Sequence, residues 1–192
     1  MIFAVICHKW TGKGRKKNIV LLFANYCKFT VNQNGDADMG ELKKGDKAPA
    51  FTGTGQDGEK VTLSSFAGRK VVLYFYPKDN TPGCTAEACN LRDNFSGLTG
   101  KGFVVIGVSP DSENSHNKFI SKYKLPFILV SDPEKVILKA YNAWGKKILY
   151  GKAFNGVLRK TYIIDEKGII LAVIEKVNTG DHTKQILDSL NN

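Results

Sequence analysis

Apolar runs alternate with segments of helical periodicity along most of the chain. Five runs have the length and composition of β-strands and lie at residues 71–76, 103–108, 127–130, 161–164 and 169–175. The first run, Val-Val-Leu-Tyr-Phe-Tyr, has no polar interruption, which is typical of a strand that is buried on both faces. The polar residues 165–168 separate the last two runs and predict a hairpin turn. Because strands alternate with helical segments, the pattern predicts an α/β architecture.

Three segments outside these runs are predicted to be helices because their apolar residues repeat every three or four positions. Two of them are 112–124, with Phe119, Ile120 and Tyr123, and 181–191, with Ile186, Leu187 and Leu190. The third is expected to have Asp132 as its N-cap and Pro133 as its first helical residue. Its buried stripe would contain Val136, Ile137, Ala140, Tyr141 and Trp144.

A turn and a helix start place the first of two closely spaced cysteines at the end of the buried strand. Pro77 ends the strand, residues 81–83 form a Thr-Pro-Gly turn, and the residues after Cys84 favour a helix. Leu91, Phe95 and Leu98 then fall on one helical face. Cys84 is therefore expected in or just before the first helical turn.

The start of a helix favours the deprotonated form of a cysteine. Unpaired backbone N–H groups and the positive end of the helix dipole both stabilise a thiolate there. The pKa of a cysteine in such a place can fall from roughly 8.5 into the range of about 3.5 to 7.5. Cys84 is therefore a candidate nucleophile at neutral pH. The alternative is that Cys84 and Cys89 are two small buried apolar residues, as intracellular cysteines usually are.

Spacing argues against several other kinds of cysteine site. Cys84 and Cys89 are five residues apart, whereas dithiol oxidoreductases of the C-x-x-C type need a gap of three. No second cysteine pair or histidine pair completes a tetrahedral zinc site. The histidines of the chain are His8, His116 and His182. His116 and His182 are expected in polar, solvated helical surroundings, so a Cys–His pair stays open only if the fold brings one of them to a cysteine.

The remaining chemistry is oxidation of a thiolate to a sulfenic acid, which a neighbouring thiol then captures. In an unbroken α-helix, the Cα atoms of two residues five apart are separated by about 8.5 Å. A disulfide tolerates a Cα separation of about 7 Å at most. We therefore expect a folded dithiol form and a locally unfolded disulfide form of the segment around Cys84 and Cys89.

The pattern Pro77-x-x-x-Thr81-x-x-Cys84, followed by Cys89, resembles the active-site loop of peroxiredoxins. It is most similar to the subfamily known as peroxiredoxin Q or bacterioferritin comigratory protein. Further segments that resemble the family stand in the expected order at 45–51, 56–58, 71–77, 107–111 and 156–165. The resemblance covers residues 39–192. It implies a thioredoxin-like fold, in which helices flank a central mixed β-sheet.

The resemblance also implies a role for each of five residues. Cys84 would be the peroxidatic cysteine, and Cys89 would be the resolving cysteine that joins it in a disulfide. Thr81 would hydrogen-bond the sulfur and the peroxide, and Pro77 would shield the sulfur from water. Arg159 would stabilise the thiolate and polarise the O–O bond, since fixed donors aimed at developing charge lower a reaction barrier. Without the resemblance, Arg159 would be interpreted as a solvated surface charge.

The implied activity is that of a thiol-specific peroxidase, which reduces hydrogen peroxide and organic hydroperoxides in antioxidant defence and redox homeostasis. No metal or other cofactor is implied, and thioredoxin or a similar reductant would reduce the disulfide. The resemblance favours a monomer, and thiols that cycle through a disulfide favour the cytoplasm. Two other functions stay open: a non-catalytic thiol redox switch or chaperone that uses the same disulfide, and a disulfide isomerase in which Cys89 is the attacking thiol.

Residues 1–38 differ from the rest of the chain in charge. They contain six Lys and Arg residues against two Asp residues, in a chain of net charge +10. Their apolar stretches, 1–7 and 19–24, are far shorter than the roughly 20 residues of a transmembrane helix. We expect a flexible basic arm or an artefact of start-site assignment, and Cys7 and Cys27 have no assigned role. The other basic residues are scattered and form no stripe with aromatic residues, which argues against nucleic-acid binding.

Overall fold

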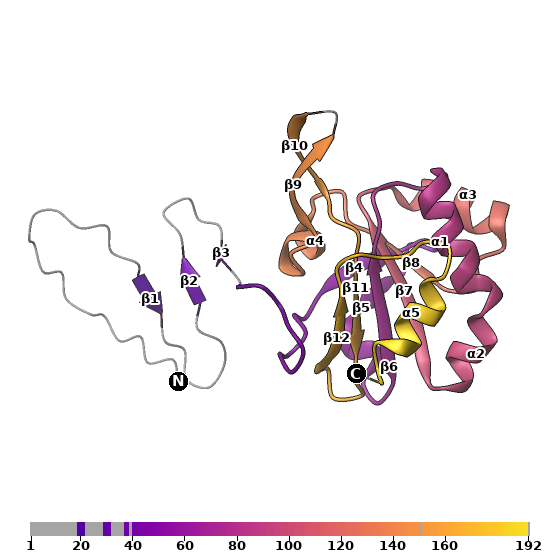
Figure 1. The fold of residues 1–192 in the computed structure, drawn as a ribbon, viewed down its shortest axis with the longest axis horizontal. Coiled ribbons are helices and arrows are strands. Elements are labelled where there is room, and N and C mark those ends of the chain that lie inside the picture. Colours follow the sequence, from indigo (N-terminus) through magenta and orange to yellow (C-terminus); the bar gives the residue numbers. More distant parts are fainter. Residues whose placement is uncertain (1–18, 22–28, 32–36, 39, 150, 192) are drawn as a thin grey trace, which may run out of the picture. The chain divides into compact units, whose positions relative to one another are not determined.

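The computed structural model describes residues 19–21, 29–31, 37–38, 40–149 and 151–191 (Figure 1). The chain divides into two units, Met1–Gly40 and Glu41–Asn192. In the first unit, three short strands form an antiparallel sheet in the order β1 (Ile19–Leu21), β2 (Phe29–Val31) and β3 (Ala37–Asp38). Most of the expected basic arm lies outside the described residues, as do Cys7 and Cys27.

A seven-stranded sheet forms the centre of the second unit, in the order β12-β11-β6-β7-β8-β4-β5. Its strands are β4 (Thr52–Gly55), β5 (Lys60–Thr62), β6 (Lys70–Phe75), β7 (Phe103–Ser109), β8 (Ile128–Ser131), β11 (Lys160–Ile164) and β12 (Ile170–Ile174). β7 runs parallel to β6 and to β8, while the other neighbours are antiparallel. The five strands expected from the apolar runs and the mixed sheet are therefore confirmed, as is the hairpin turn between β11 and β12.

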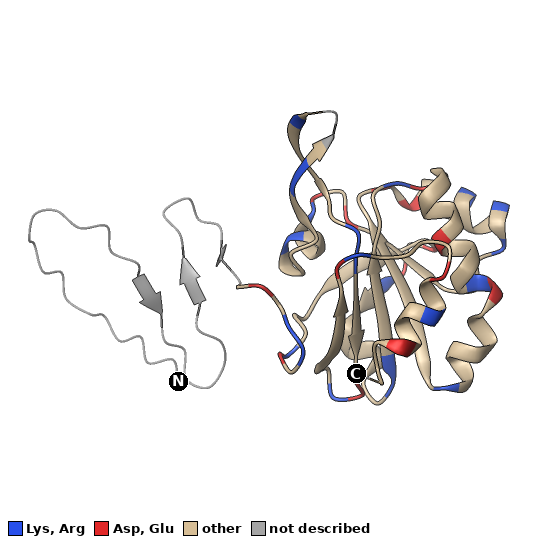
Figure 2. Cartoon of the chain, viewed as in Figure 1, with Lys and Arg blue, Asp and Glu red and all other residues tan. Residues whose placement is uncertain are grey.

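Helices cover the two faces of this sheet. They are the 3-10 helix η1 (Leu63–Phe66) and the α-helices α1 (Pro82–Asp93), α2 (Phe95–Gly100), α3 (Glu113–Tyr123), α4 (Val136–Ala140) and α5 (His182–Asp188). Among the described residues, no helix is long and apolar enough to cross a membrane. Lys and Arg residues are spread over strands, helices and loops of this unit, with acidic residues among them (Figure 2).

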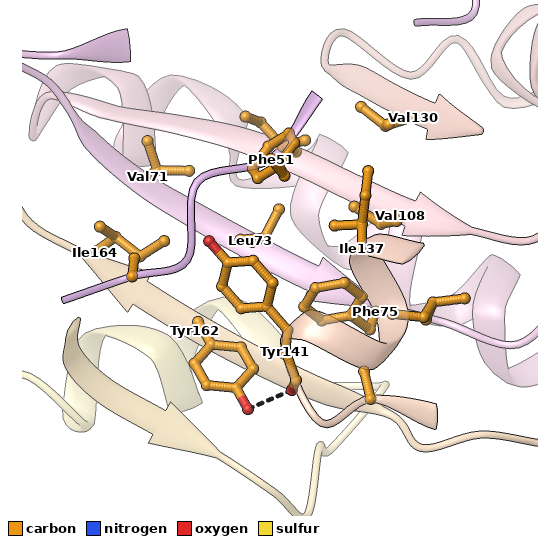
Figure 3. Close-up of a cluster of buried hydrophobic side chains, with 14 of the residues drawn as sticks. Phe51, Val71, Leu73, Phe75, Val108, Val130, Ile137, Tyr141, Tyr162 and Ile164 are labelled. Carbon is orange, nitrogen blue, oxygen red and sulfur yellow. Dashed lines mark hydrogen bonds between the residues drawn. The ribbon is translucent and has the colours of Figure 1, made fainter. Parts of the chain in front are cut away.

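Alternate residues of β6 belong to two separate core clusters, because successive side chains of a strand point to opposite faces. Val71, Leu73 and Phe75 enter the cluster that Figure 3 shows, together with Tyr141 and Tyr162. Val72, Tyr74 and Tyr76 enter the other cluster, together with Cys84, Leu91, Phe119 and Ile186. Both faces of β6 are therefore covered, which explains its unbroken apolar run. Cys84 lies in the cluster that α1, α2, α3 and α5 form with this face of the sheet.

The helix predicted to start at Pro133 starts later and is shorter. Lys135 has a left-handed backbone with φ 60°, so the chain turns before α4 begins at Val136. The Asp132 carboxylate accepts hydrogen bonds from the N–H groups of Val136 at 2.9 Å and Leu138 at 2.8 Å. Asp132 therefore does cap this helix, but across a turn and not as its immediate N-cap.

The buried stripe expected for this helix is also partly wrong. Ile137 and Tyr141 are buried, but Val136 is 65% exposed. Trp144 lies outside the helix and opens β9 (Trp144–Leu149), which forms an antiparallel hairpin with β10 (Lys152–Val157). This hairpin was not predicted. β10 is exposed over most of its length, so it lacks the apolar pattern that marks a buried strand.

The helix after the cysteines is broken at Asn94, whereas the spacing of Leu91, Phe95 and Leu98 predicted one continuous stripe. Asn94 has a non-helical φ of −107°, and its side chain donates to the carbonyl oxygen of Asn90 at 2.8 Å. Such local bonds from Asn compete with helix continuation. Leu91 and Leu98 are nevertheless both fully buried, so the expected core face survives the break.

Candidate active site

Cys84 is the third residue of α1, so the prediction that it lies in the first turn is confirmed. Thr81 is the N-cap with an extended backbone, and Pro82 occupies the first helical position, where its missing N–H is not needed. Cys84 is a free thiol and is only 2% exposed. The residue therefore combines the helix start that favours a thiolate with a nearly complete exclusion of water.

The guanidinium of Arg159 connects the Cys84 sulfur to a buried carboxylate. Arg159 lies in the link between β10 and β11, and its Nη2 donates to Cys84 Sγ at 3.1 Å. Its Nη1 forms an ion pair with Glu87 Oε2. Burial lowers the pKa of Arg159, but Glu87 and Cys84 more than reverse this effect, so the pKa is raised overall. Arg159 is therefore a permanent cation in contact with the sulfur and not a solvated surface charge.

Glu87 is a residue of this site that the sequence did not reveal. It follows Cys84 by three positions, so the two residues are neighbours on one side of α1. The Glu87 side chain is fully buried. Burial raises the pKa of Glu87 to about 7, although Arg159 acts in the opposite direction. A lone glutamate in a helix usually indicates a solvated position, and only the position of Arg159 in the fold explains why this one is buried.

His182, at the start of α5, lies against Glu87 and is fully buried, so the expectation of solvated surroundings is wrong. Its Nδ1 is 3.3 Å from Glu87 Oε1, and its Nε2 is hydrogen-bonded to Thr161 Oγ1 at 3.0 Å. Burial, and then the charge of Arg159, lower the pKa of His182 to about 4. The sequence did contain a signal for this burial, because His182 and the core residue Ile186 are four positions apart on one helical face.

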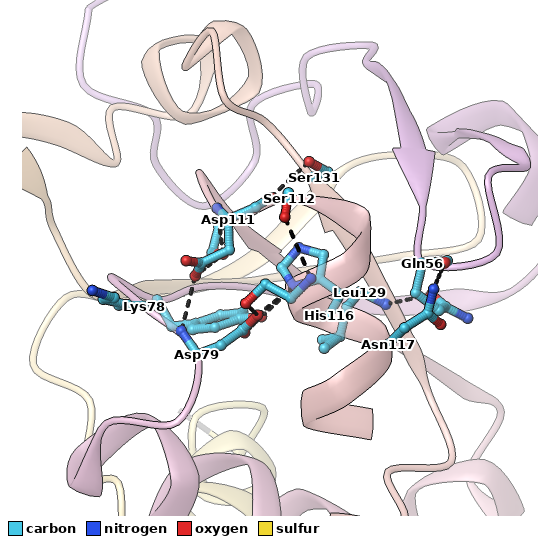
Figure 4. Close-up of polar contacts among 12 residues, drawn as sticks. Gln56, Lys78, Asp79, Asp111, Ser112, His116, Asn117, Leu129 and Ser131 are labelled. Atoms are coloured by element: carbon cyan, nitrogen blue, oxygen red, sulfur yellow. Dashed lines mark hydrogen bonds and ion pairs between the residues drawn. The ribbon is translucent and has the colours of Figure 1, made fainter. Parts of the chain in front are cut away.

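A second buried polar cluster holds the loop that leads into α1 (Figure 4). The Asp79 carboxylate accepts hydrogen bonds from Tyr76 Oη and from Ser115 Oγ, both at 2.7 Å. His116 Nδ1 lies 2.9 Å from Asp79 Oδ2. The backbone N–H of Asp79 donates to Asp111 Oδ2 at 2.8 Å. These bonds join the loop to α3 and to the loop that follows β7.

His116 is fully buried, so the expectation that it lies in solvated surroundings is wrong as well. It stands three residues before the buried Phe119 on one face of α3, which was the available sequence signal. Burial raises the pKa of Asp79, but the contacts from His116 and from two hydroxyl groups outweigh this, so the pKa is lowered overall. Residues 77–81 are therefore fastened to the fold by an ionised carboxylate.

Thr81 and Pro77 both lie in this fastened loop, beside the start of α1. The Thr81 hydroxyl donates to the carbonyl oxygen of Lys78 at 3.0 Å. A rotation of that hydroxyl would be needed before it could donate to the Cys84 sulfur, so this contact stays a prediction. Pro77 is half-buried, and its role as a shield also stays a prediction.

Cys89 is half-buried and is also a free thiol. It lies in the same unbroken helix as Cys84, because α1 extends from Pro82 to Asp93. The structure therefore contains the dithiol arrangement in which helix geometry keeps the two sulfurs from bonding. Among the described residues, no group of three or more His, Cys, Asp and Glu side chains is arranged to hold a metal ion.

Glu87 and His182 should change the pH dependence of stability in opposite directions. The pKa of Glu87 is raised from 4.5 to about 7, so the folded state binds more protons than the unfolded state between these values. Its contribution to the free energy of unfolding therefore falls as the pH rises. In a Glu87→Gln variant this contribution is lost. The free energy of unfolding of the variant relative to the wild type should then rise by about 3 kcal/mol between pH 4.5 and pH 7.

A His182→Asn variant should show the opposite trend. The pKa of His182 is lowered from 6.5 to about 4, so between these values only the unfolded state binds the proton. The wild type gains stability from this residue as the pH rises. The free energy of unfolding of the variant relative to the wild type should therefore fall by about 3 kcal/mol between pH 4 and pH 6.5. Urea unfolding over a pH series measures both differences. Curves parallel to the wild type would show that neither group has a shifted pKa.

Comparisons with known proteins identify relatives of this chain. Residues 44–173 match the sequence profile of the AhpC/TSA family. The peroxiredoxin Bcp of Bacillus subtilis is 43% identical over 149 residues, which cover 78% of this chain and 95% of the relative.

Solved structures show the same relationship. The bacterioferritin comigratory protein of Xanthomonas campestris, whose structures address alkyl peroxide reduction, is 33% identical with a TM-score of 0.69, over 73% of this chain and 90% of its own. The peroxiredoxin Q of Xylella fastidiosa is 29% identical with a TM-score of 0.73, over 79% and 97% of the two chains.

Proposed function

Because this chain belongs to the AhpC/TSA family and is a thiol peroxidase of the peroxiredoxin Bcp and peroxiredoxin Q group, we propose that Cys84 attacks the hydroperoxide and that Cys89 resolves the product. The observation that carries this proposal is the contact of 3.1 Å between Arg159 Nη2 and Cys84 Sγ at the start of α1. It combines a nucleophile, a helix dipole and a fixed cation in one place.

In the first step, the Cys84 thiolate attacks one oxygen of the hydroperoxide. The S–O bond forms as the O–O bond breaks, so the sulfur becomes a sulfenic acid and the second oxygen leaves as an alkoxide or hydroxide, which takes up a proton. Negative charge moves from the sulfur to the departing oxygen. Arg159 is placed to stabilise both ends of this movement, since it presents several N–H donors in one plane.

In the second step, the Cys89 thiol attacks the Cys84 sulfenic acid. The S–S bond forms, and the hydroxyl group leaves as water. A dithiol protein such as thioredoxin then exchanges with the disulfide, so that both cysteines return to thiols and the reductant is oxidised. Substrates would be hydrogen peroxide and alkyl hydroperoxides. The protein would work as a monomer in the cytoplasm, where the reductant is kept reduced.

Disulfide formation in this scheme requires α1 to unwind. The helix holds the Cα atoms of Cys84 and Cys89 about 8.5 Å apart, which exceeds the limit of about 7 Å for a disulfide. After treatment with one equivalent of peroxide, peptide mass spectrometry should find a Cys84–Cys89 linkage. Hydrogen exchange of the backbone amides at 84–92 should become faster by at least about tenfold, because their helical hydrogen bonds are lost.

Two controls make this measurement decisive. A Cys89→Ser variant treated in the same way should stop at the Cys84 sulfenic acid and keep the slow amide exchange of the dithiol form. Amides of α3 serve as an internal reference, because that helix carries neither cysteine. Equal exchange at 84–92 before and after oxidation would contradict the unwinding, and a linkage to another cysteine would contradict the role of Cys89.

A further inference from the structure

Three buried side chains continue the contact between Cys84 and Arg159 into the interior of the protein. They are Glu87 from α1, His182 from α5 and Thr161 from β11, and each is fully buried or nearly so. Glu87 Oε1 and His182 Nδ1 face each other at 3.3 Å. Among the described residues, both atoms are buried, and neither has a hydrogen-bond partner within ideal geometry. Each of these two atoms is therefore the nearest available hydrogen-bond partner of the other.

We propose that His182 is a positioning residue for peroxide reduction: its imidazole holds the Glu87 carboxyl group, and Glu87 holds the Arg159 guanidinium against the Cys84 sulfur. The inference rests on the proposed role of Cys84. His182 touches neither the sulfur nor a substrate, so it acts only through Glu87 and Arg159.

The geometry gives His182 this influence because each group in the series serves two partners. Arg159 uses Nη1 for Glu87 and Nη2 for Cys84, so a shift of the carboxyl group moves the donor at the sulfur. Glu87 in turn uses Oε2 for Arg159, which leaves Oε1 to His182. A buried carboxylate oxygen without a donor is costly, so without the imidazole the carboxyl group would reorient.

His182 is also suited to hold Glu87 in either protonation state. With an ionised carboxylate, Nδ1–H donates to Oε1 and the Thr161 hydroxyl donates to Nε2. With a protonated carboxyl group, Oε1–H donates to Nδ1 and Nε2–H donates to the hydroxyl, because a hydroxyl can serve as donor or acceptor. The other titratable or charged groups that face this pair are Arg159, Cys84 and Tyr74, whose ring centroid is 6.2 Å from that of His182.

The competing explanation is that His182 only fastens α5 to α1. Other bonds already make that connection, since Asn90 Oδ1 accepts from the Thr183 N–H at 2.8 Å and Asn90 Nδ2 donates to the Gly180 carbonyl oxygen at 3.0 Å. A purely structural histidine would therefore affect stability and leave the sulfur unchanged. A positioning histidine would change the reactivity of the sulfur.

Two substitutions of His182 separate these explanations because each keeps one half of the ring's hydrogen bonding. In His182→Asn, the amide lies near the former Nδ1 and can still reach Glu87. In His182→Gln, the amide lies near the former Nε2, so it can reach Thr161 but not Glu87. Each variant loses one of the two buried polar contacts of the ring, and both should be destabilised to a similar extent.

The experiment measures the pH profile of Cys84 alkylation and the second-order rate of peroxide reduction, in a Cys89→Ser background. For His182→Gln, we expect the alkylation profile to move to higher pH and the peroxide rate to fall about tenfold, because the Arg159 donor is displaced. His182→Asn should stay within about twofold of the parent in both measurements. Urea unfolding of the two variants shows whether their stabilities are matched.

The proposal is overturned if His182→Gln equals its parent, or if both variants lose rate in proportion to their loss of stability. A second measurement needs no variant at all: the NMR signals of the His182 imidazole nitrogens in the intact protein should shift when Cys84 is deprotonated or oxidised. Invariant signals would also overturn it. If instead the parent protein shows no peroxide reaction at Cys84, the proposed function itself is wrong.

Discussion

A Cys84→Ser variant is expected to lose peroxide turnover by at least a factor of about a thousand, because removal of the nucleophile leaves only the other groups of the site. A serine hydroxyl is not ionised near neutral pH beside Arg159, and it cannot become a sulfenic acid. The assay follows peroxide consumption with thioredoxin and its reductase as the electron source. Residual turnover near the wild-type level would remove Cys84 from the mechanism.

The Cys89→Ser variant is the matched control for this experiment, since it makes the same atomic change about 1.4 turns further along the same helix. It should consume about one equivalent of peroxide per molecule and then stop, because the sulfenic acid has no partner. The wild type should instead turn over repeatedly. Stoichiometric oxidation of the wild type without turnover would favour the redox switch. A wild-type protein in which Cys89 is reactive and Cys84 is not would favour the isomerase.

An Arg159→Ala variant should lower kcat/KM for hydroperoxides by about 10²- to 10³-fold, which is the typical loss when one preorganised donor to a developing negative charge is removed. The substitution removes the cation at the sulfur and also leaves the buried Glu87 without its ion pair. Steady-state kinetics with the same thioredoxin assay measures the effect. Measurement with hydrogen peroxide and with an alkyl hydroperoxide should give similar losses, because in the proposed mechanism Arg159 acts on the O–O bond that both substrates share.

An Arg159→Lys variant tests whether shape matters as well as charge. An ammonium group is a single point, whereas the guanidinium contacts Glu87 and Cys84 through two different nitrogens. We expect Lys to recover only part of the activity that Ala loses. Arg69→Ala is a suitable control because Arg69 is exposed and lies before β6, outside the site. A kcat/KM for Arg159→Ala equal to that of this control would contradict the role of Arg159.

The strands and the cysteine helix could be predicted because the sequence signal for each is local. The run at 71–76 consists of six consecutive apolar or aromatic residues, and the residues around Cys84 form a contiguous motif. The start of α4 and the β9–β10 hairpin could not be predicted, because neither has such a local signal. The carboxylate of Asp132 caps its helix across a turn, and the exposed β10 has no apolar period to detect.

The polar interior could not be predicted in the same way, because a buried charge depends on a partner that is distant in the sequence. Glu87 and Arg159 are 72 residues apart, and Asp79 and His116 are 37 residues apart. Each of these side chains alone is typical of a solvated surface. For His182 and His116, the core residues on the same helical face are a sequence signal that outweighs their polarity.

If α1 unwinds in each cycle as proposed, the attachment of Asp79 gives its refolding a fixed starting point. Its bonds to α3 and to the loop after β7 lie before Cys84 in the chain, so they would persist while the residues between the two sulfurs lose their helical form. After reduction, the helix would regrow from this retained end within nanoseconds for each added residue. Such regrowth is far faster than typical enzyme turnover of about 1 to 10³ per second. In the proposed cycle, the protein would therefore rebuild its nucleophile each time without slowing the reaction.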